Sequence, residues 1–279
     1  MVVLVTGANG QLGQSLQYIS AQYSNVEFHF YASSELDITN EYTIKEIFSL
    51  IKPNFCINAA AYTAVDKAEA ETEKATLVNV TGAKKLAKIC NEFATTLIHV
   101  STDFVFDGLN DSPYTEEDAT NPQGVYGATK REGEIEIIKH LKHYFIVRTS
   151  WLYSSFGNNF MKTMLKLANE RKRLNVVNDQ IGTPTHAIDL AQALVKIVLS
   201  GSQNYGIYHY SNEGKTSLYG FAKEIFNFNN TKIDLKPIPS SEFPTPAKRP
   251  KYSVLDKSKI KSEFGISIKD WKESLRFYK

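Results

Sequence analysis

The sequence of 279 residues lacks several features, and each absence argues against a class of protein. It has only two cysteines, Cys56 and Cys90, both in apolar surroundings, which predicts buried thiols in a reducing, cytoplasmic compartment and no disulfide framework. No apolar run reaches the roughly 18 residues of a membrane span, and no basic segment typical of a signal peptide precedes the first strand. The net charge of +2 indicates no general nucleic-acid surface. We therefore expect neither a membrane nor a nucleic acid as partner.

Ligand patterns for metal ions are also missing. The six histidines are scattered along the chain and form no ligand constellation. His140 and His143 lie near the expected end of a helix, where a solvated cation is favourable. The sequence thus predicts no metal.

The first segment carries a glycine-rich turn between a strand and a helix. Residues 2–5 form a short apolar, β-branched run, which is typical of a buried parallel strand. Gly7, Gly10 and Gly13 follow at once in the spacing G-x-x-G-x-x-G, and Leu12 and Leu16 continue with a helical period. Such glycines permit a tight turn and a close approach of backbone to a pyrophosphate, which the helix start attracts. The pattern predicts dinucleotide binding.

The rest of the first half alternates between strands and helices. We expect strands at 26–31, 55–58, 97–100 and 145–148, and helices at 41–51, 69–93 (with a break near 81–82) and 130–140. This alternation predicts an α/β fold: a doubly wound, Rossmann-like parallel sheet with a smaller C-terminal substrate domain. The expected boundaries are 1–150 for the dinucleotide-binding domain, joined by about 175–200 through a chain return, and 151–279 for the substrate domain.

Tyr126 and Lys130 lie four residues apart, at the start of helix-forming sequence. This spacing places both side chains on one helical face. A nearby ammonium group favours the phenolate, so we expect Lys130 to lower the pKa of Tyr126 and make it a usable general acid. The alternative is a packed tyrosine beside a solvated surface lysine.

Several further segments resemble a known family. They include residues 101–108 (STDFVFDG), 148–153 (RTSWLY), 157–160 (GNNF), 179–185 (DQIGTPT) and 249–250 (RP). With the glycine turn and the Tyr126/Lys130 pair, they identify the chain as similar to the extended short-chain dehydrogenases/reductases and, among these, to the dTDP-4-dehydrorhamnose reductase family. The similarity runs over nearly the whole length.

The resemblance implies reduction of the 4-keto group of dTDP-4-dehydro-L-rhamnose to dTDP-L-rhamnose by a cytoplasmic NAD(P)H-dependent oxidoreductase. Tyr126 would donate the proton, Thr102 would hydrogen-bond the same oxygen, and Lys130 would hold the tyrosine's pKa and the nicotinamide ribose. Thr102 and Asp103 also suit the capping of a turn. Related dehydratases carry a second acid where this chain has Phe104, which argues against dehydratase chemistry. The family usually has a tyrosine there, so substrate range can differ.

The resemblance also implies the ligand-binding residues. The family commonly uses NADPH, so NADPH is the first choice of cofactor. We expect NADH to be accepted as well, because no Lys or Arg precedes Lys45 and Glu35 follows the two serines near the expected 2′-phosphate position. The acidic position at which some family members hold magnesium is Ser15 here. The expected cofactor-binding residues are Gly7, Asn9, Gly10, Gln11, Leu12, Gly13, Ser33, Asp37, Ile38, Ala59, Ala60, Ala61, Tyr62, Thr63, Asn79, Tyr126 and Lys130. The expected substrate-binding residues are Thr102, Asp103, Phe104, Tyr126, Trp151, Asn159, Phe160 and Arg249.

Two alternatives remain open at this point. The chain could act on a different nucleotide-sugar, or it could be a non-catalytic dinucleotide-binding subunit that resembles the regulatory subunit of methionine adenosyltransferase. Trp151 and Phe160 suit a core as well as a binding surface. We expect a monomer or a weak homodimer.

Overall fold

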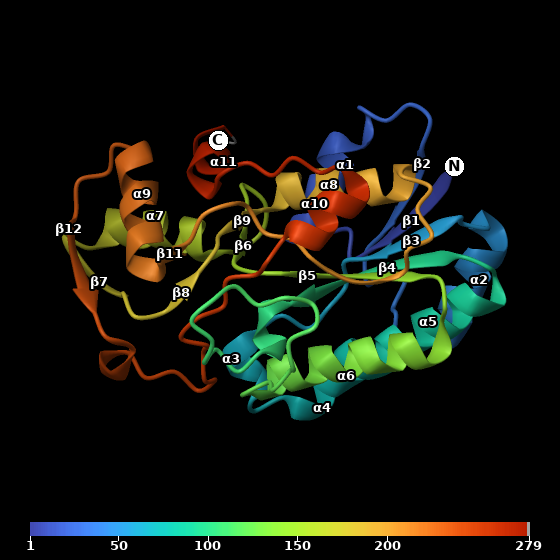
Figure 1. Ribbon diagram of the computed structural model, residues 1–279, viewed down its shortest axis with the longest axis horizontal. Coiled ribbons are helices and arrows are strands. Elements are labelled where there is room, and N and C mark those ends of the chain that lie inside the picture. The colour runs from blue at the N-terminus through green and yellow to red at the C-terminus, as the bar shows by residue number, and fades with distance from the viewer. Residues whose placement is uncertain (278–279) are drawn as a thin grey trace.

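The computed structural model describes residues 1–277 and centres on a six-stranded parallel sheet (Figure 1). The strand order is β10-β5-β4-β3-β1-β2. From β1 the chain goes outward to β2, then returns and builds the other side of the sheet, as in a doubly wound fold. The predicted fold class is confirmed. The strands are β1 (Val2–Thr6), β2 (Glu27–Tyr31), β3 (Phe55–Asn58), β4 (Thr96–Thr102), β5 (Tyr144–Thr149) and β10 (Gly206–His209).

Helices cover both faces of this sheet (Figure 1). On one face Val3, Val5 and Ile98 pack against α1 (Gln11–Ser20), α8 (Ala187–Leu199) and α10 (Ser258–Phe264). On the other face Leu4 and Leu97 pack against α2 (Glu41–Ile51), α5 (Ala83–Glu92) and α6 (Val125–His140). Successive strand residues face opposite sides of a sheet, so both hydrophobic cores come from the same strands.

The helical segment predicted at 69–93 is interrupted differently from the expectation. α4 (Thr72–Thr76) runs into a π-helical turn, η1 (Leu77–Gly82), and then into α5 without a break. A Cβ on Gly82 would lie 2.8 Å from the Ile38 side chain, so the glycine allows close packing here and does not end the helix. The short α3 (Val65–Ala68) precedes this segment.

A smaller unit lies beside the sheet, at the left of Figure 1. It packs around its own apolar cluster, which includes Tyr153, Phe221 and Trp271. The predicted boundary near residue 150 stays a prediction, but β10 joins the large sheet and α8 packs against α1, so the chain returns to the first half. No helix within residues 1–277 is long and apolar enough to cross a membrane. The remaining elements are η2 (Asp103–Val105), β6 (Leu152–Tyr153), α7 (Phe160–Glu170), β7 (Arg173–Val177), β8 (Ile181–Gly182), β9 (Thr185–His186), β11 (Thr216–Ser217), α9 (Leu218–Phe228), β12 (Asp234–Ile238), η3 (Ser240–Glu242) and α11 (Trp271–Phe277).

Candidate active site

A cleft of about 600 Å³ opens at the carboxyl ends of β3, β4 and β5, beside the start of α1. This is the edge at which doubly wound sheets bind ligands. Many of the predicted residues meet here. From the predicted set, the cleft is lined by Asn9, Gly10, Gln11, Leu12, Ala59, Ala61, Thr63, Thr102, Asp103, Phe104, Tyr126, Lys130, Trp151 and Asn159.

The glycine turn forms a cradle at one end of the cleft. Gly7 has a φ of +71°, and a Cβ there would lie 2.7 Å from the backbone of Ala59 and Ala60. A Cβ on Gly13 would lie 2.3 Å from the Gly7 carbonyl oxygen. No side chain caps the start of α1 at Gly10, so its first N–H groups remain available to an anion. The cradle therefore suits the pyrophosphate of a dinucleotide.

The other predicted cofactor residues do not line the cleft. Ser33 and Asp37 are exposed after β2, and Ile38 is buried in the core. Tyr62 and Asn79 bond each other: the Tyr62 N–H donates to Asn79 Oδ1 at 2.9 Å, and Asn79 Nδ2 donates to the Tyr62 carbonyl at 3.1 Å. Asn79, in the π-helical turn, thereby fixes the loop after β3. Contact of these residues with a cofactor stays a prediction.

Tyr126 lies in the first turn of α6, which confirms its predicted helical position. Its hydroxyl faces that of Thr102, at the end of β4, and the Thr102 hydroxyl itself donates to Asp103 Oδ1 at 3.0 Å. The Phe104 ring meets the Tyr126 ring edge to face at 5.6 Å between centroids. A Cβ on Gly127 would lie 2.2 Å from the Phe104 carbonyl oxygen, so glycine lets α6 approach η2 this closely.

We expected Lys130 to lower the pKa of Tyr126, and the structure contradicts this expectation. Burial raises the pKa of Tyr126 to about 12; the Thr102 hydrogen bond opposes this rise and the Asp103 charge adds to it. Lys130 contributes nothing, because its amine is turned toward β4. Burial likewise raises the pKa of Asp103 to about 6, against hydrogen bonds from Ser253 and Thr102.

Lys130 is buried, with 2% of its surface exposed. Its Nζ donates to the Val100 carbonyl at 2.7 Å and lies 3.1 Å from His99 Nε2. Burial lowers the pKa of Lys130 to about 8, and the charge of Glu134 opposes this shift. Sequence reasoning did not single out His99. The alternation of side chains along a strand could have identified it. His99 follows Leu97 by two residues and therefore faces the same side of the sheet, the side that α6 covers.

A second pocket, of about 230 Å³, shares Phe104, Trp151 and Leu152 with the cleft. Trp151 adopts a left-handed backbone with a φ of +46°, which is uncommon for a bulky residue. A Cβ on Gly182 would lie 2.6 Å from the Trp151 ring, so a glycine is needed behind it. Of the predicted substrate residues Phe160 and Arg249 also line this pocket, and sequence reasoning missed Leu218, Phe221, Pro250 and Gln180.

Two predicted substrate residues already have protein partners. Arg249 forms a two-pronged ion pair with Asp66 of α3, at 3.0 and 2.7 Å, and this pair lowers the pKa of the carboxyl. Asn159 accepts from the Lys162 N–H at the start of α7, and its amide donates to Gln11 Oε1 at 2.9 Å. Substrate contact by either residue stays a prediction.

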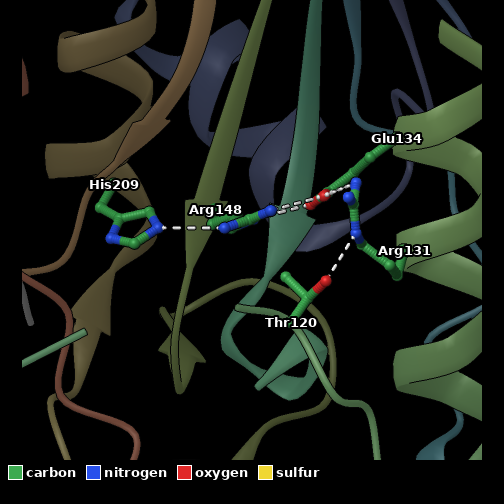
Figure 2. Close-up of polar contacts among 5 residues, drawn as sticks. All are labelled: Thr120, Arg131, Glu134, Arg148 and His209. Carbon is green, nitrogen blue, oxygen red and sulfur yellow. Dashed lines mark hydrogen bonds and ion pairs between the residues drawn. The ribbon is translucent and has the colours of Figure 1, made fainter. Parts of the chain in front are cut away.

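A second buried basic side chain is Arg148, at the end of β5, which lies between Glu134 of α6 and His209 of β10 (Figure 2). Its guanidinium donates to both carboxylate oxygens of Glu134, at 2.9 and 2.8 Å, and lies 3.5 Å from His209 Nε2. Arg131 also donates to Glu134 at 3.2 Å and to the Thr120 hydroxyl at 2.9 Å. Burial lowers the pKa of His209 to about 3, so this histidine is uncharged at neutral pH.

Two buried hydroxyls at the cleft, on strand ends where a ligand was expected, are not among the predicted binding residues. Ser101 Oγ and Thr149 Oγ1 have no hydrogen-bond partner among the described residues, although both residues line the cleft. Buried polar groups normally have partners, so these hydroxyls are suited to bond a bound molecule.

The described residues contain no group of three or more His, Cys, Asp or Glu that could hold a metal ion. Ser15, at the position where the family can have an acid, donates from Oγ to the Gln11 carbonyl at 2.8 Å. Cys56 and Cys90 are both free and buried, as predicted.

Comparison with known proteins gives matches over nearly the whole chain. Residues 1–278 match the family described as RmlD substrate binding domain. The dTDP-4-dehydrorhamnose reductase of Aggregatibacter actinomycetemcomitans is 43% identical, over 98% of this chain and 97% of that protein. The structure of a dTDP-4-dehydrorhamnose reductase from Clostridium acetobutylicum has a TM-score of 0.95 at 44% identity, over 100% of this chain and 98% of that one. The Bacillus anthracis dTDP-4-dehydrorhamnose reductase, solved in complex with NADP, has a TM-score of 0.94 at 39% identity, over 99% and 98%.

The parallel sheet, the glycine cradle and these relatives together define a class, a nicotinamide-dependent oxidoreductase of the short-chain dehydrogenase/reductase type. The sequence identity of these matches and their coverage of the chain identify the family within this class. The chain belongs to the dTDP-4-dehydrorhamnose reductase family, as its sequence motifs predicted.

Proposed function

We propose that the protein reduces the 4-keto group of dTDP-4-dehydro-L-rhamnose to give dTDP-L-rhamnose. The observation that carries the proposal is the identity of about 40% to reductases of that name, over nearly the full length of both chains. The cleft supports it, because Thr102, Tyr126 and Lys130 all line one cavity next to the glycine cradle.

In this proposal Tyr126 is the proton donor. Its pKa of about 12 keeps the phenol protonated at neutral pH, which is the form that a reduction requires. Thr102 hydrogen-bonds the same substrate oxygen and stabilises the charge that develops on it. The nicotinamide, when bound, supplies the hydride. Phe104 fixes the orientation of the Tyr126 ring through their edge-to-face contact.

The direct test mixes the purified protein with NADPH and the keto-sugar nucleotide and follows nicotinamide absorbance near 340 nm, a property of the cofactor. We expect stoichiometric oxidation, dTDP-L-rhamnose as product, and strong selectivity over a simple ketone, because remote binding energy positions C4. Tight dinucleotide binding without turnover of any sugar would instead support a regulatory subunit. The intact Thr102, Tyr126 and Lys130 set favours an enzyme.

A second candidate is reduction of a different nucleotide-sugar, and Phe104 is the observation that favours it. Its ring lines both the cleft and the smaller pocket, where the family usually presents a tyrosine hydroxyl. If the lost hydroxyl matters, Phe104→Tyr should raise kcat/KM for dTDP-4-dehydro-L-rhamnose. An unchanged kcat/KM in this variant, with wild-type turnover high, would remove the basis for the second candidate.

For the cofactor we propose NADPH with NADH also accepted. Lys85 donates to the Thr39 carbonyl at 2.7 Å, which brings one cation to the loop after β2, while Glu35 accepts from the Ala32 N–H in the same loop. These opposite charges should limit the preference in kcat/KM to about ten- to a hundredfold, or 1.4–2.8 kcal/mol. Ser33→Arg should shift it toward NADPH by adding a charge-assisted phosphate contact. A wild-type preference above about a thousandfold would contradict this account.

We also propose that turnover needs no metal and that the protein acts as a monomer or weak homodimer. Activity should survive treatment with EDTA, and added magnesium should not raise it. Loss on chelation with recovery in magnesium would show a metal requirement.

A further inference from the structure

A chain of buried polar side chains runs from Lys130 under the floor of the cleft. Lys130 Nζ lies 3.1 Å from His99 Nε2, and His99 Nδ1 lies 2.9 Å from Asn58 Nδ2. Asn58 Oδ1 accepts from the Thr6 hydroxyl at 2.7 Å and from the Ala60 N–H at 3.1 Å. Asn58 and His99 are each 1% exposed, so water does not replace these contacts.

The backbone fixes the orientation of the Asn58 amide. A backbone N–H can only donate, so the Asn58 atom that faces the Ala60 N–H must be the oxygen. The amide nitrogen of Asn58 therefore faces His99 Nδ1, and since an amide nitrogen only donates, Nδ1 must accept.

This orientation decides where the proton of His99 lies. Burial keeps the pKa of His99 well below its usual value, and the charge of Lys130, when present, lowers it further, so the ring is neutral in either case and carries one N–H. With Nδ1 accepting, that N–H is on Nε2, and it points at Lys130 Nζ. A charged Lys130 ammonium has no lone pair to accept this N–H. Two donors, the ammonium and the His99 Nε2–H, would then face each other.

We propose that His99 is a positioning residue that donates from Nε2 to the Lys130 amine in its uncharged form and thereby favours that form. The amine accepts this bond, donates one N–H to the Val100 carbonyl and keeps a second N–H for the cleft. Protonation of Lys130 then has to break the His99 contact or change the histidine tautomer. The Asn58–His99 pair thereby helps to set the pH at which Lys130, which lines the cleft with Tyr126, becomes charged.

The other titratable groups around Lys130 do not remove the conflict. Glu134, on the same helix, favours the charged amine but has its carboxylate bonded to Arg148 and Arg131. Tyr126 on α6 and Asp103 on η2 also line the cleft or its wall. Among residues 1–277 no carboxylate lies within ion-pair distance of Lys130 Nζ.

His209 provides an internal control, because its contacts require the opposite tautomer. Its Nδ1 lies 3.1 Å from the Tyr114 carbonyl, which can only accept, and its Nε2 faces the donating Arg148 guanidinium. Two buried histidines in one protein should therefore carry their protons on different ring nitrogens.

The test reads both tautomers by long-range ¹H–¹⁵N NMR of the imidazole rings at about pH 9, above the pKa of about 8 for Lys130. Variants His99→Gln and His209→Gln assign the signals. We expect an Nε2–H tautomer for His99 and an Nδ1–H tautomer for His209. An Nδ1–H tautomer or an imidazolium at His99 would overturn the proposal. The measurement needs no turnover, so its outcome is separate from that of the proposed reaction.

Asn58→Asp tests the consequence for Lys130. A carboxylate at this position still accepts from Thr6 and Ala60, but its second oxygen would accept from His99 Nδ1–H, which forces Nε2 to accept from a charged Lys130. The Lys130 titration, followed by ¹³C NMR of labelled lysine, should move up by at least about one pH unit, a tenfold change in the proton equilibrium. The same upward shift should appear in the kcat–pH profile.

The added carboxylate also attracts the ammonium directly, so the upward shift counts only together with a switch of His99 to the Nδ1–H tautomer in the same variant. An unmoved Lys130 titration, or a retained Nε2–H tautomer, in folded Asn58→Asp would overturn the proposal. If that variant does not fold, His99→Gln serves instead, because its carboxamide oxygen can accept from the ammonium group and should raise the Lys130 titration as well.

Discussion

Lys130 on α6 and Arg148 on β5 are both buried basic side chains and both face a buried histidine, yet they are held in different ways. Arg148 is 1% exposed and forms a two-pronged ion pair with Glu134, which is fully buried. Lys130 meets a carbonyl and an imidazole. Glu134 follows Lys130 by one helical turn, but its carboxylate is directed to Arg148 and Arg131 (Figure 2).

The difference shows how the packing of one helix against the sheet can hold a permanently charged basic side chain and a titratable one. A guanidinium stays protonated in proteins, whereas a lysine amine changes its charge readily when buried. The Arg148–Glu134 pair ties α6 to β5 at every physiological pH. Lys130 lies in the cleft, where a change of charge affects chemistry. We therefore assign the Arg148 cluster (Arg148, Glu134 and Arg131) to stability and the Lys130 cluster (Lys130 and His99) to catalysis. The following predictions test that division.

The largest effect should come from Arg148→Met. This variant leaves Glu134 buried with only Arg131 as a cationic partner, and breaking a buried pair on one side costs about 3–5 kcal/mol. Urea denaturation should show this loss in the free energy of unfolding. The matched control is the double variant Arg148→Met with Glu134→Gln, which removes both charges and should recover part of the loss. A single variant within about 1 kcal/mol of wild type would show that the cluster does not stabilise the fold.

Tyr126→Phe should have its effect on catalysis. Removal of the hydroxyl takes away the proposed proton donor, so kcat should fall by about 10²-fold or more, while NADPH affinity stays nearly unchanged. The free energy of unfolding should change by less than in Arg148→Met, because the variant keeps the ring and its contact with Phe104 and leaves no buried charge without a partner. Near wild-type turnover would remove Tyr126 from the mechanism.

Lys130→Met should change how stability depends on pH. The Lys130 pKa is lowered from its ordinary value of 10.5 to about 8, so between these values the folded chain binds fewer protons than the unfolded chain. Stability of the wild type should therefore rise with pH across this window, by about 1–3 kcal/mol, through this group. Other lysines and tyrosines titrate there too, so the measurement is the difference between wild type and Lys130→Met. A difference that is flat from pH 8 to 10.5 would show that Lys130 is not desolvated.

The two clusters also differ in how far sequence could predict them. The glycine turn, the parallel sheet and the position of Tyr126 on a helix follow local patterns, and the structure confirms them. The charge on Lys130 does not follow from its spacing to Tyr126, because Asn58 and His99 come from two other strands and reach it only in the folded sheet. The partner of Arg148 is equally non-local. Burial also reversed the expected pKa shift of Tyr126, since desolvation depends on packing that a local pattern does not contain.

The smallest effect should come from a third pair, Asp66 and Arg249, which has the same two-pronged geometry outside the core. The Asp66 side chain is 41% exposed and that of Arg249 is 26% exposed, so solvent screens their attraction. Asp66→Asn should cost about 0.2–1 kcal/mol at neutral pH, well below Arg148→Met. The pair lowers the pKa of Asp66, so its contribution is present above the ordinary value of 3.8 and disappears as pH falls through the lowered value. Urea denaturation at pH 7 and pH 3 should show the difference from wild type shrink at the lower pH. A loss of about 3 kcal/mol or more at pH 7 would mean that the two-pronged geometry, and not burial, sets the strength of these pairs, and would undo the distinction drawn here between exposed and buried charges.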